Sequence, residues 1–510
     1  MKSRKEKIYK NIISSVSLNI FNLVISFVNR IIFLHILDVY YLGINSLFSN
    51  ILGVLSLADL GLSTAMMYSL YKPIADDDTE KIKNLVWFFR KIYLAIAIVV
   101  FSLGVSVLPF LEYIINMDVY IPYIKVYYMI SLLSVVVSYL FVYRSILISA
   151  DQKQYVINKI SFYFRIITFI VQLVILIIFK NYIYYLLAAL ILSVLNNFIL
   201  NKKAIQIYPF LKEKANKISK DEKTNIIINI KSLFIYRFCA TLQNNTDNIF
   251  ISIFVGTAVV GIYSNYLLVV THITSIISLV FNQIKATMGN ILAKDETGTM
   301  EKLKLFELFE FLNFWIIAFS AIAFFVLFQD FIFIVFGSDF LLDNKIVFII
   351  SALFYSRNIR QTIWVFRETT GLFSQTKYIS LLTTIINMVL SVLFGRHIGL
   401  LGILLATIIS VHLSSFWFEP LVLFHKYFKV STKRYFVNYL KNIILLVIAG
   451  VITYYLANLF IGANIYTTFA FKILICTLVP NILFLIFTFK TKEFNYFRNM
   501  LLKLVKSKFN

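Results

Sequence analysis

The sequence predicts an all-α polytopic membrane protein of about 14 transmembrane helices, arranged as two pseudo-symmetric six-helix lobes plus two C-terminal helices. Its 510 residues are 60% hydrophobic, compared with about 45–50% in typical soluble domains, and the mean hydropathy is +0.83. Apolar runs of about 18 residues or more, long enough to cross a bilayer as helices, recur throughout the chain. Both cysteines, Cys239 and Cys476, lie within such runs, so we expect no structural disulfide.

The apolar runs place the helices along the chain. They are expected at 11–37, 42–71, 84–110, 123–149, 156–179, 182–201, 226–254, 258–290, 305–336, 346–368, 378–395, 399–424, 436–460 and 466–489. The resulting divisions are an N-terminal lobe over 1–203, a polar linker over 204–225, a C-terminal lobe over 226–427, and two helices with a basic tail over 428–510. The basic start, MKSRKEKIYK, precedes a long span without a small-residue cleavage site, so we interpret it as a retained first helix.

The net charge of +23 is distributed as a topology signal. Loops on one side of the predicted helices, together with both termini, hold most of the Lys and Arg residues. The connections on the opposite side hold only Lys125, Lys180, Lys345 and Arg396. Because basic loops stay in the cytoplasm, both termini are predicted to be cytoplasmic and the number of helices to be even. The same distribution argues against a nucleic acid as the partner.

Two helices about 218 residues apart carry polar residues in the same register. The segment VGIYSNY aligns with LGINSLF and places Gly261 on Gly43. Without a gap, the alignment continues as Asp247 on Asn29, Asn248 on Arg30, Asn244 on Ser26 and Arg237 on Asn19. The chain is therefore predicted to consist of two related halves.

Each of these two helices has a polar stripe along one face. The stripes consist of Ser15, Asn19, Asn22, Ser26, Asn29 and Arg30 in the first helix, and of Arg237, Thr241, Asn244, Asn248 and Ser252 in the second. An arginine near the middle of a bilayer costs about 2.5–3.5 kcal/mol on insertion scales. Such stripes are therefore expected to face a water-filled cavity or a partner helix.

Arginines within the predicted spans are the main candidates for substrate binding. A guanidinium pairs with phosphate through two parallel hydrogen bonds and stays charged at cellular pH, so a cationic cavity implies an anionic cargo. The candidate residues are Arg30, Arg237, Asn29, Asn244, Asn248, Lys285, Arg357 and Arg360. As an alternative, each arginine reaches a lipid headgroup or pairs with Asp59, Asp247 or Glu368. For Arg144, Arg165 and Arg367, near the cytoplasmic ends, this alternative accounts for the charge at least as well as a role in the cavity does.

Asp247 and Asp59 are candidates for binding a coupling ion, either H⁺ or Na⁺. For Asp247 the alternative is a plain ionic partner for Arg237 or Arg30. The five histidines show no metal-ligand spacing and the chain has no phosphate-binding P-loop motif, so we expect no metal, no other cofactor and no nucleotide. The expected outward loops of about 4 to 12 residues leave little room for the catalytic groups of a membrane glycosyltransferase or polymerase.

Two segments carry a family resemblance: LGINSLFSNILGVLSLADLGLSTAM near the start and LQNNTDNIFISIFVGTAVVGIYSNY at the repeat. They resemble the Wzx-type polysaccharide flippases, which export O-antigen and capsule repeat units and belong to the MOP exporter superfamily. The resemblance covers essentially the whole chain and implies a MATE-like fold without enzymatic activity. It also implies a bacterial plasma-membrane protein that moves undecaprenyl-pyrophosphate-linked repeat units to the outer leaflet by alternating access.

The same resemblance implies the ligands and the site. It makes a polyprenyl-pyrophosphate-linked glycan and membrane lipid the ligands, with glycan polymerases and glycosyltransferases as partners, and it maps the cationic central cavity of the family onto Arg30 and Arg237, then Arg357 and Arg360. Three alternatives remain open: a multidrug or small-molecule efflux antiporter of the same fold, a lipid II flippase, and an integral glycan polymerase or transferase. Lipid II flippases carry several arginines in the first helix, whereas this chain has Arg30 alone there.

Overall fold

The computed structural model describes residues 2–56, 62–116, 119–292, 298–370, 372–460, 462 and 464–499. Over these residues the regular structure is helical, and none of it forms a β-strand. Large apolar side chains such as Ile98, Ile178 and Ile486 remain exposed along the helices, as expected where helices face lipid hydrocarbon. The chain is an all-α multi-pass membrane protein, as the sequence predicts.

Contacts within the chain divide it into unit 1, Met1–Gly261, and unit 2, Ile262–Asn510. The main helices of unit 1 are α1 (Lys2–Leu37), α2 (Val39–Leu55), α3 (Leu62–Ala75), α4 (Thr79–Val107), α5 (Leu111–Ile114), α6 (Ile124–Tyr139), α7 (Val142–Ala150), α8 (Gln154–Phe179), α9 (Tyr182–Ile207) and α10 (Lys220–Phe254). Helix α11 (Thr257–Leu292) begins in unit 1 and continues in unit 2. Unit 2 further contains α12 (Thr299–Phe336), α13 (Asn344–Asn358), α14 (Gln361–Thr369), α15 (Phe373–Leu413), α16 (Ser415–Leu423), α17 (Lys433–Asn458) and α18 (Ile465–Thr488).

The predicted linker over 204–225 lies inside unit 1. Helix α10, which follows it, packs against α2 and α3. The linker itself is held at the start of α4, where the Asn216 N–H donates to Asn84 Oδ1 at 2.6 Å and Lys83 Nζ lies 3.0 Å from Glu213 Oε2. The division into two six-helix lobes stays a prediction.

Each predicted span overlaps one helix or a pair of helices separated by a break. Among the described residues, eight helices are long and apolar enough to cross a membrane, or nine if α6 and α7, bent by 46°, form one span. The sequence-based number is higher because it also counts polar or interrupted segments, such as α1, α10 and the α13–α14 pair. Hydropathy alone does not detect a span when part of its surface faces polar groups.

A break in α15 separates two predicted spans. Ile398 and Gly399 have non-helical backbone angles within this helix, and Gly399 has a φ of 57°. Glycine adopts this left-handed conformation without the steric cost of a Cβ atom. The break falls where one predicted span ends at 395 and the next begins at 399, so its position is confirmed.

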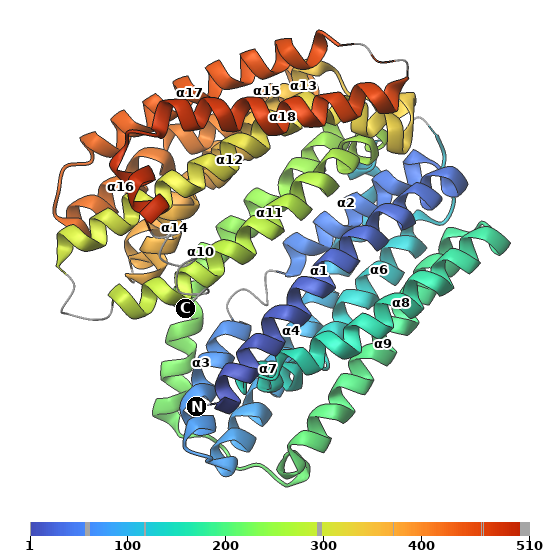
Figure 1. Ribbon diagram of the computed structural model, residues 1–510. Helices are drawn as coiled ribbons and strands as arrows, with labels where there is room; N and C mark the ends of the chain where they lie inside the picture. Colours follow the sequence, from blue (N-terminus) through green and yellow to red (C-terminus); the bar gives the residue numbers. More distant parts are fainter. Residues whose placement is uncertain are drawn as a thin grey trace. The chain divides into compact units, whose positions relative to one another are not determined.

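In unit 1, helix α8 packs against both α1 and α9, and the three helices lie side by side in Figure 1. The buried residues of α8 are Asn158, Gln172 and Leu176. The rest of this helix presents apolar residues such as Ile170 and Ile177 to the surroundings. A helix that is polar inside and apolar outside is typical of a membrane span beside a polar interior.

In unit 2, helix α12 has a long apolar middle segment and packs against α13, α17 and α18 (Figure 1), as expected for a helix buried among others. Two polar contacts join α18 to α12. Trp315 Nε1 donates a hydrogen bond to Asn481 Oδ1 at 2.7 Å, and Lys472 Nζ lies 2.7 Å from Asp330 Oδ2. These contacts fix the last long helix of unit 2 to its core.

Candidate functional site

Unit 1 contains a partly open cavity of about 480 Å³ between α1, α8 and α9. We call it the unit 1 cavity. Its lining combines amide, hydroxyl, aromatic and aliphatic side chains with a single guanidinium. The lining residues are Leu18, Asn22, Ile25, Ser26, Asn29, Asn45, Ser161, Phe164, Arg165, Thr168, Phe169, Gln172, Tyr185, Leu186, Ala189, Leu192, Ser193 and Asn196. None of these described lining residues is an Asp or a Glu, so the cavity offers no carboxylate to a cation.

Helical periodicity explains how three helices supply this lining. Residues at i, i+4 and i+7 lie on one face of a helix, and each helix repeats that spacing toward the cavity. The rows are Asn22, Ser26 and Asn29 on α1, then Ser161, Arg165 and Thr168 on α8, then Tyr185, Ala189 and Leu192 on α9, where Ser193 and Asn196 extend the same face. The α1 row is the stripe found in the sequence, and Asn29 belongs to it.

Hydrogen bonds fix several lining side chains across the helix boundaries. Arg165 Nε donates to Asn22 Oδ1 at 3.1 Å, and Asn29 Nδ2 donates to the Tyr185 hydroxyl at 2.9 Å. The buried Oδ1 of Asn196 accepts no hydrogen bond from the residues that the structure describes. The cavity therefore has a pre-arranged polar wall with acceptor capacity left over.

An aromatic cluster surrounds the Tyr185 end of the cavity. The rings of Phe33 and Tyr185 are 5.3 Å apart, those of Tyr182 and Tyr185 are 6.0 Å apart, and those of Tyr127 and Tyr182 are 4.9 Å apart. Edge-to-face and stacked pairs at these spacings are favourable. This cluster packs the ends of α1, α6 and α9 together beside the cavity.

A second cavity of about 380 Å³ adjoins the first and shares Asn45, Leu186 and Ala189 with it. Hydroxyls of α2 and α6 line it, including Ser49 and Ser131. Polar free volume in unit 1 therefore continues from α8 past α9 to α2 and α6.

The residues along the polar stripe of α10 differ in their exposure to solvent. Arg237 is exposed, and its Nη2 donates to Thr64 Oγ1 at 2.8 Å. Asn244 is also exposed, whereas Asp247 and Asn248 are buried. The stripe is thus partly accessible and partly packed inside unit 1.

The stripe of α10 ends beside the start of α11. The Ser252 hydroxyl donates to the Ile114 carbonyl at 2.8 Å and lies 2.7 Å from Thr257 Oγ1. Close packing continues on α11, because a Cβ atom on Gly43 would lie 2.1 Å from the Thr257 carbonyl oxygen. Gly43 and Gly261, which the internal repeat aligns, are also neighbours, since a Cβ on Gly261 would lie 3.1 Å from Gly43 N.

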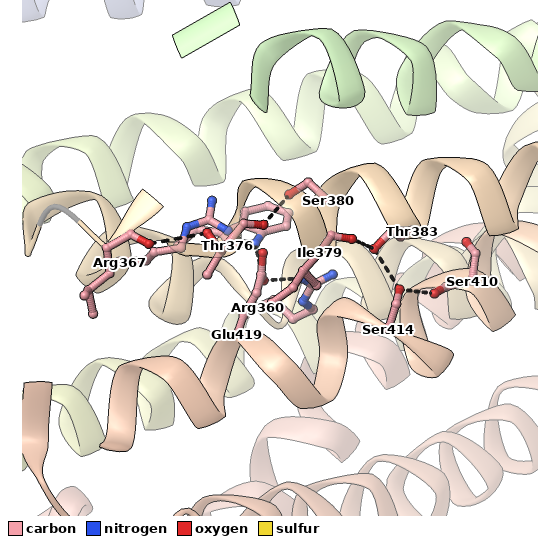
Figure 2. Close-up of polar contacts among 11 residues, drawn as sticks. Arg360, Arg367, Thr376, Ile379, Ser380, Thr383, Ser410, Ser414 and Glu419 are labelled. Atoms are coloured by element: carbon pink, nitrogen blue, oxygen red, sulfur yellow. Dashed lines mark hydrogen bonds and ion pairs between the residues drawn. The ribbon is translucent and has the colours of Figure 1, made fainter. Parts of the chain in front are cut away.

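Unit 2 contains a buried charge cluster on α14 and α16. Figure 2 shows the Glu419 carboxylate of α16 between the guanidinium groups of Arg360 and Arg367, with which it forms ion pairs. The three side chains are 3%, 5% and 1% exposed, respectively. Trp364 Nε1 also donates to Glu419 Oε2, at 3.2 Å. We call these four residues the Glu419 cluster.

The Glu419 cluster adjoins a series of hydroxyls on α15 and at Ser414, which follows it. In Figure 2 this series runs from Thr376 and Ser380 to Thr383, which lies 2.7 Å from the Ser414 hydroxyl. The sequence analysis named Asp59, Asp247 and Glu368 as possible acidic partners of the arginines but missed Glu419. A single glutamate within the apolar run SSFWFEPLVLF was the signal that could have identified it.

The predicted site residues therefore lie in different places. Asn29 lines the unit 1 cavity, whereas the half-buried Arg30 that follows it on α1 does not. Arg360 is part of the Glu419 cluster, and Arg357 is half-buried on α13. The Lys285 side chain and Asp59 lie outside the described residues. The polar rows of α8 and α9 were missed, although polar residues at helical spacing in apolar helices could have predicted them.

Comparisons with known proteins bear on the fold. No protein-family model matches the chain, and no curated protein matches its sequence. Among solved structures, it is similar to the lipid II flippase MurJ in an inward closed conformation, with a TM-score of 0.66, 16% identity, and coverage of 94% of this chain and 99% of that one. A MATE transporter from Vibrio cholerae gives a TM-score of 0.58 at 12% identity, with coverage of 80% and 94%.

A multidrug resistance MATE family transporter of the MOP superfamily, in an inward-facing conformation, is also similar. Its TM-score is 0.55 at 12% identity, with coverage of 78% of this chain and 94% of that one. These similarities extend over most of each chain. The protein therefore has the same MATE-like fold as these transporters.

Proposed function

We propose that the protein is a flippase for undecaprenyl-pyrophosphate-linked oligosaccharide repeat units. It moves them from the inner to the outer leaflet of a bacterial plasma membrane, for the synthesis of a cell-surface polysaccharide such as capsule or O-antigen. The protein does no covalent chemistry on the cargo, and both of its termini are cytoplasmic. Glycosyltransferases supply the lipid-linked unit and a glycan polymerase consumes it.

The unit 1 cavity carries this proposal. Its described lining combines nine amide and hydroxyl side chains other than Tyr185 with one guanidinium and no carboxylate. A pump for organic cations would need acidic groups at this position, because an uncompensated cation in a membrane interior is costly. Polyhydroxylated and anionic cargo suits such a lining, since amides and hydroxyls both donate and accept hydrogen bonds.

The arginines of the predicted stripes supply the charge that a pyrophosphate needs. In this proposal Arg30 on α1 and Arg237 on α10 hold the pyrophosphate. Arg237 is exposed and donates a hydrogen bond to Thr64, and a guanidinium has five N–H donors in all. Asn244, Asn248, Lys285 and Arg357 are further candidates for contact with the cargo. Arg360 would have to exchange Glu419 for the cargo, so we assign it a smaller part in binding.

Transport proceeds by alternating access in this proposal. The lobes over 1–203 and 226–427 rock about the bound headgroup while the prenyl tail stays in the lipid, as in other transporters built from repeats. A coupling ion, H⁺ or Na⁺, resets the protein through Asp247 or Asp59. The buried position of Asp247 is compatible with ion binding, since intramembrane carboxylates commonly mark ion pathways.

The fold similarity to MurJ adds independent support for a lipid-linked cargo, because that protein is described as a lipid II flippase. It also keeps lipid II as the first alternative substrate. The similarity to MATE transporters described as multidrug resistance proteins keeps efflux as the second. The distinction between them depends on the cargo.

The test is to deplete the protein in its native host and determine the leaflet in which the lipid-linked precursors accumulate. We expect the surface-polysaccharide repeat unit to be trapped in the cytoplasmic leaflet, with lipid II delivered normally. Trapped lipid II would instead identify a peptidoglycan flippase. Drug sensitivity with normal glycan would identify an efflux pump, and altered polymer length without trapped precursor would identify a polymerase.

The binding roles are tested in the same cells. Arg30→Ala and Arg237→Ala are each expected to lower export of the repeat unit, because each removes a charged group from the proposed pyrophosphate site. If both variants export glycan normally while being present at wild-type levels, the assignment of the pyrophosphate to these arginines is wrong.

A further inference from the structure

We propose that the unit 1 cavity is a subsite for sugar residues of the cargo that carry no positive charge. This inference rests on the proposed flippase function and adds the location and the chemical class of the group that is bound. It places the sugars inside one unit, among α1, α8 and α9, separately from the pyrophosphate at Arg30 and Arg237.

The size of the cavity suits this ligand. At about 480 Å³, it falls within the range of about 300–1,000 Å³ that is usual for small-molecule sites. The adjoining cavity of about 380 Å³, which shares Asn45 with it, offers room for a second sugar residue. The two volumes together form a site for a short oligosaccharide.

The chemistry of the walls points to sugar hydroxyls. Asn22, Asn29 and Gln172 each carry both a donor and an acceptor, as a sugar hydroxyl does. Asn196 Oδ1 is buried and accepts no hydrogen bond from the described residues, so an entering hydroxyl would satisfy it. Polar groups of this kind are costly inside a membrane protein unless they have partners, which a sugar supplies.

Aromatic and aliphatic residues complete the match. Phe164, Phe169 and Tyr185 line the cavity together with its polar rows. A sugar ring has apolar C–H faces and a polar rim, so alternating aromatic and amide groups fit it better than a uniformly polar or apolar wall would. Tyr185 is itself held by Asn29 at 2.9 Å, which fixes the position of its ring.

The charge of the lining selects among sugars. Arg165 is the single charged group among the described lining residues, and its Nε is bonded to Asn22. An aminosugar cation would meet no carboxylate there and would be repelled by the guanidinium. Neutral sugars are therefore expected to bind, and cationic sugars to be excluded.

The experiment measures binding of two probes to the full-length protein in lipid nanodiscs by native mass spectrometry. The probes are undecaprenyl pyrophosphate and the same lipid carrying a neutral disaccharide. For the wild type, we expect the glycosylated lipid to bind about tenfold more tightly, the effect of a few additional hydrogen bonds. The preference, not the absolute affinity, reports on the sugar subsite.

Ser193→Phe fills the cavity from α9 and is expected to abolish the preference while leaving the affinity for the bare lipid unchanged. The matched control is Leu195→Phe on the same helix, where the side chain is 44% exposed on the outer surface and the preference should persist. Gln172→Leu removes an amide without adding bulk and should also lower the preference for the glycosylated lipid. This second variant tests the subsite if Ser193→Phe does not fold.

The possible outcomes separate the two proposals. If Ser193→Phe and Gln172→Leu fold and keep the full preference for the glycosylated lipid, the sugar subsite is overturned while the flippase remains. The same holds if the wild type binds both lipids equally. If the wild type binds neither lipid, the proposed function itself fails, and this inference fails with it.

Discussion

The unit 1 cavity and the Glu419 cluster show two ways in which a membrane protein uses buried polar residues. In unit 2, Arg360 and Arg367 are paired with one carboxylate and almost inaccessible. In unit 1, Arg165 is bonded to an amide and lines free volume. A buried arginine that is held in an ion pair has little accessible surface left for a ligand, whereas a polar wall beside free volume can bind one. The role of an arginine in a membrane span therefore depends on the group that its guanidinium contacts and on whether free volume lies beside it.

The strongest test of this contrast is Glu419→Gln. The substitution leaves two buried guanidinium groups without their carboxylate, and breaking a buried pair typically costs about 3–5 kcal/mol. We expect a large fall in thermal stability in detergent, measured by the unfolding of the purified protein. Glu307→Gln is the control, because its partner Arg434 is 61% exposed and such pairs contribute about 0–1 kcal/mol. Equal losses in both variants would contradict the structural role of Glu419.

Replacing all three charged residues of the Glu419 cluster tests whether the cluster acts in stability or in binding. The variant Arg360→Met, Arg367→Met and Glu419→Leu leaves no unpaired charge, and replacing buried ion pairs with apolar residues is often neutral. We expect it to regain most of the stability that Glu419→Gln loses, as measured by the same unfolding assay. If the triple variant also transports glycan normally, Arg360 has no essential part in binding. If the triple variant is stable but does not transport glycan, Arg360 takes part in binding the cargo.

Substitutions in the unit 1 cavity should affect transport more than stability. Asn29→Leu removes the hydrogen bond to Tyr185, which costs about 1 kcal/mol, while it also replaces part of the polar wall with an apolar side chain. We expect a modest fall in melting temperature and a strong fall in glycan export per molecule of folded protein. Val28→Leu, at an exposed position on the same helix, should change neither. A loss of export no greater than the loss of folded protein would argue for a structural role of Asn29.

The smallest expected effect is that of Arg165→Lys. The charge is kept, but lysine lacks the Nε group that donates to Asn22. We expect unchanged stability and a few-fold lower export, with the greater part of the activity retained. Complete loss of export would mean that Arg165 contacts the cargo directly.

Much of the helical architecture could be predicted from the sequence, because lipid demands long apolar helices with satisfied backbone groups. The position of the break near Gly399 was predicted from the limits of the apolar runs. The polar face of α1 around Asn29 was predicted from the helical spacing of its polar residues. The pairing of Arg360 with Glu419, 59 residues away, could not be predicted in this way, since periodicity within one helix does not specify its neighbour.

The contribution of α8 and α9 to the cavity was missed for a different reason. These helices are so apolar overall that their few polar residues, among them Thr168 and Ser193, do not stand out as a stripe. Only the packing of α8 between α1 and α9 brings them to one space. Isolated polar residues at helical spacing in strongly apolar helices are therefore useful candidates for cavity-lining positions.

Transbilayer movement of the cargo in proteoliposomes tests the central claim most directly. The purified protein is reconstituted with an undecaprenyl-pyrophosphate-linked neutral oligosaccharide, and the fraction reaching the opposite leaflet is followed by its accessibility to an added glycosidase. We predict movement that depends on the protein and that falls strongly in Arg30→Ala and Asn29→Leu. No movement of this lipid under an imposed H⁺ or Na⁺ gradient, together with expulsion of a cationic dye, would contradict the flippase and indicate an efflux pump.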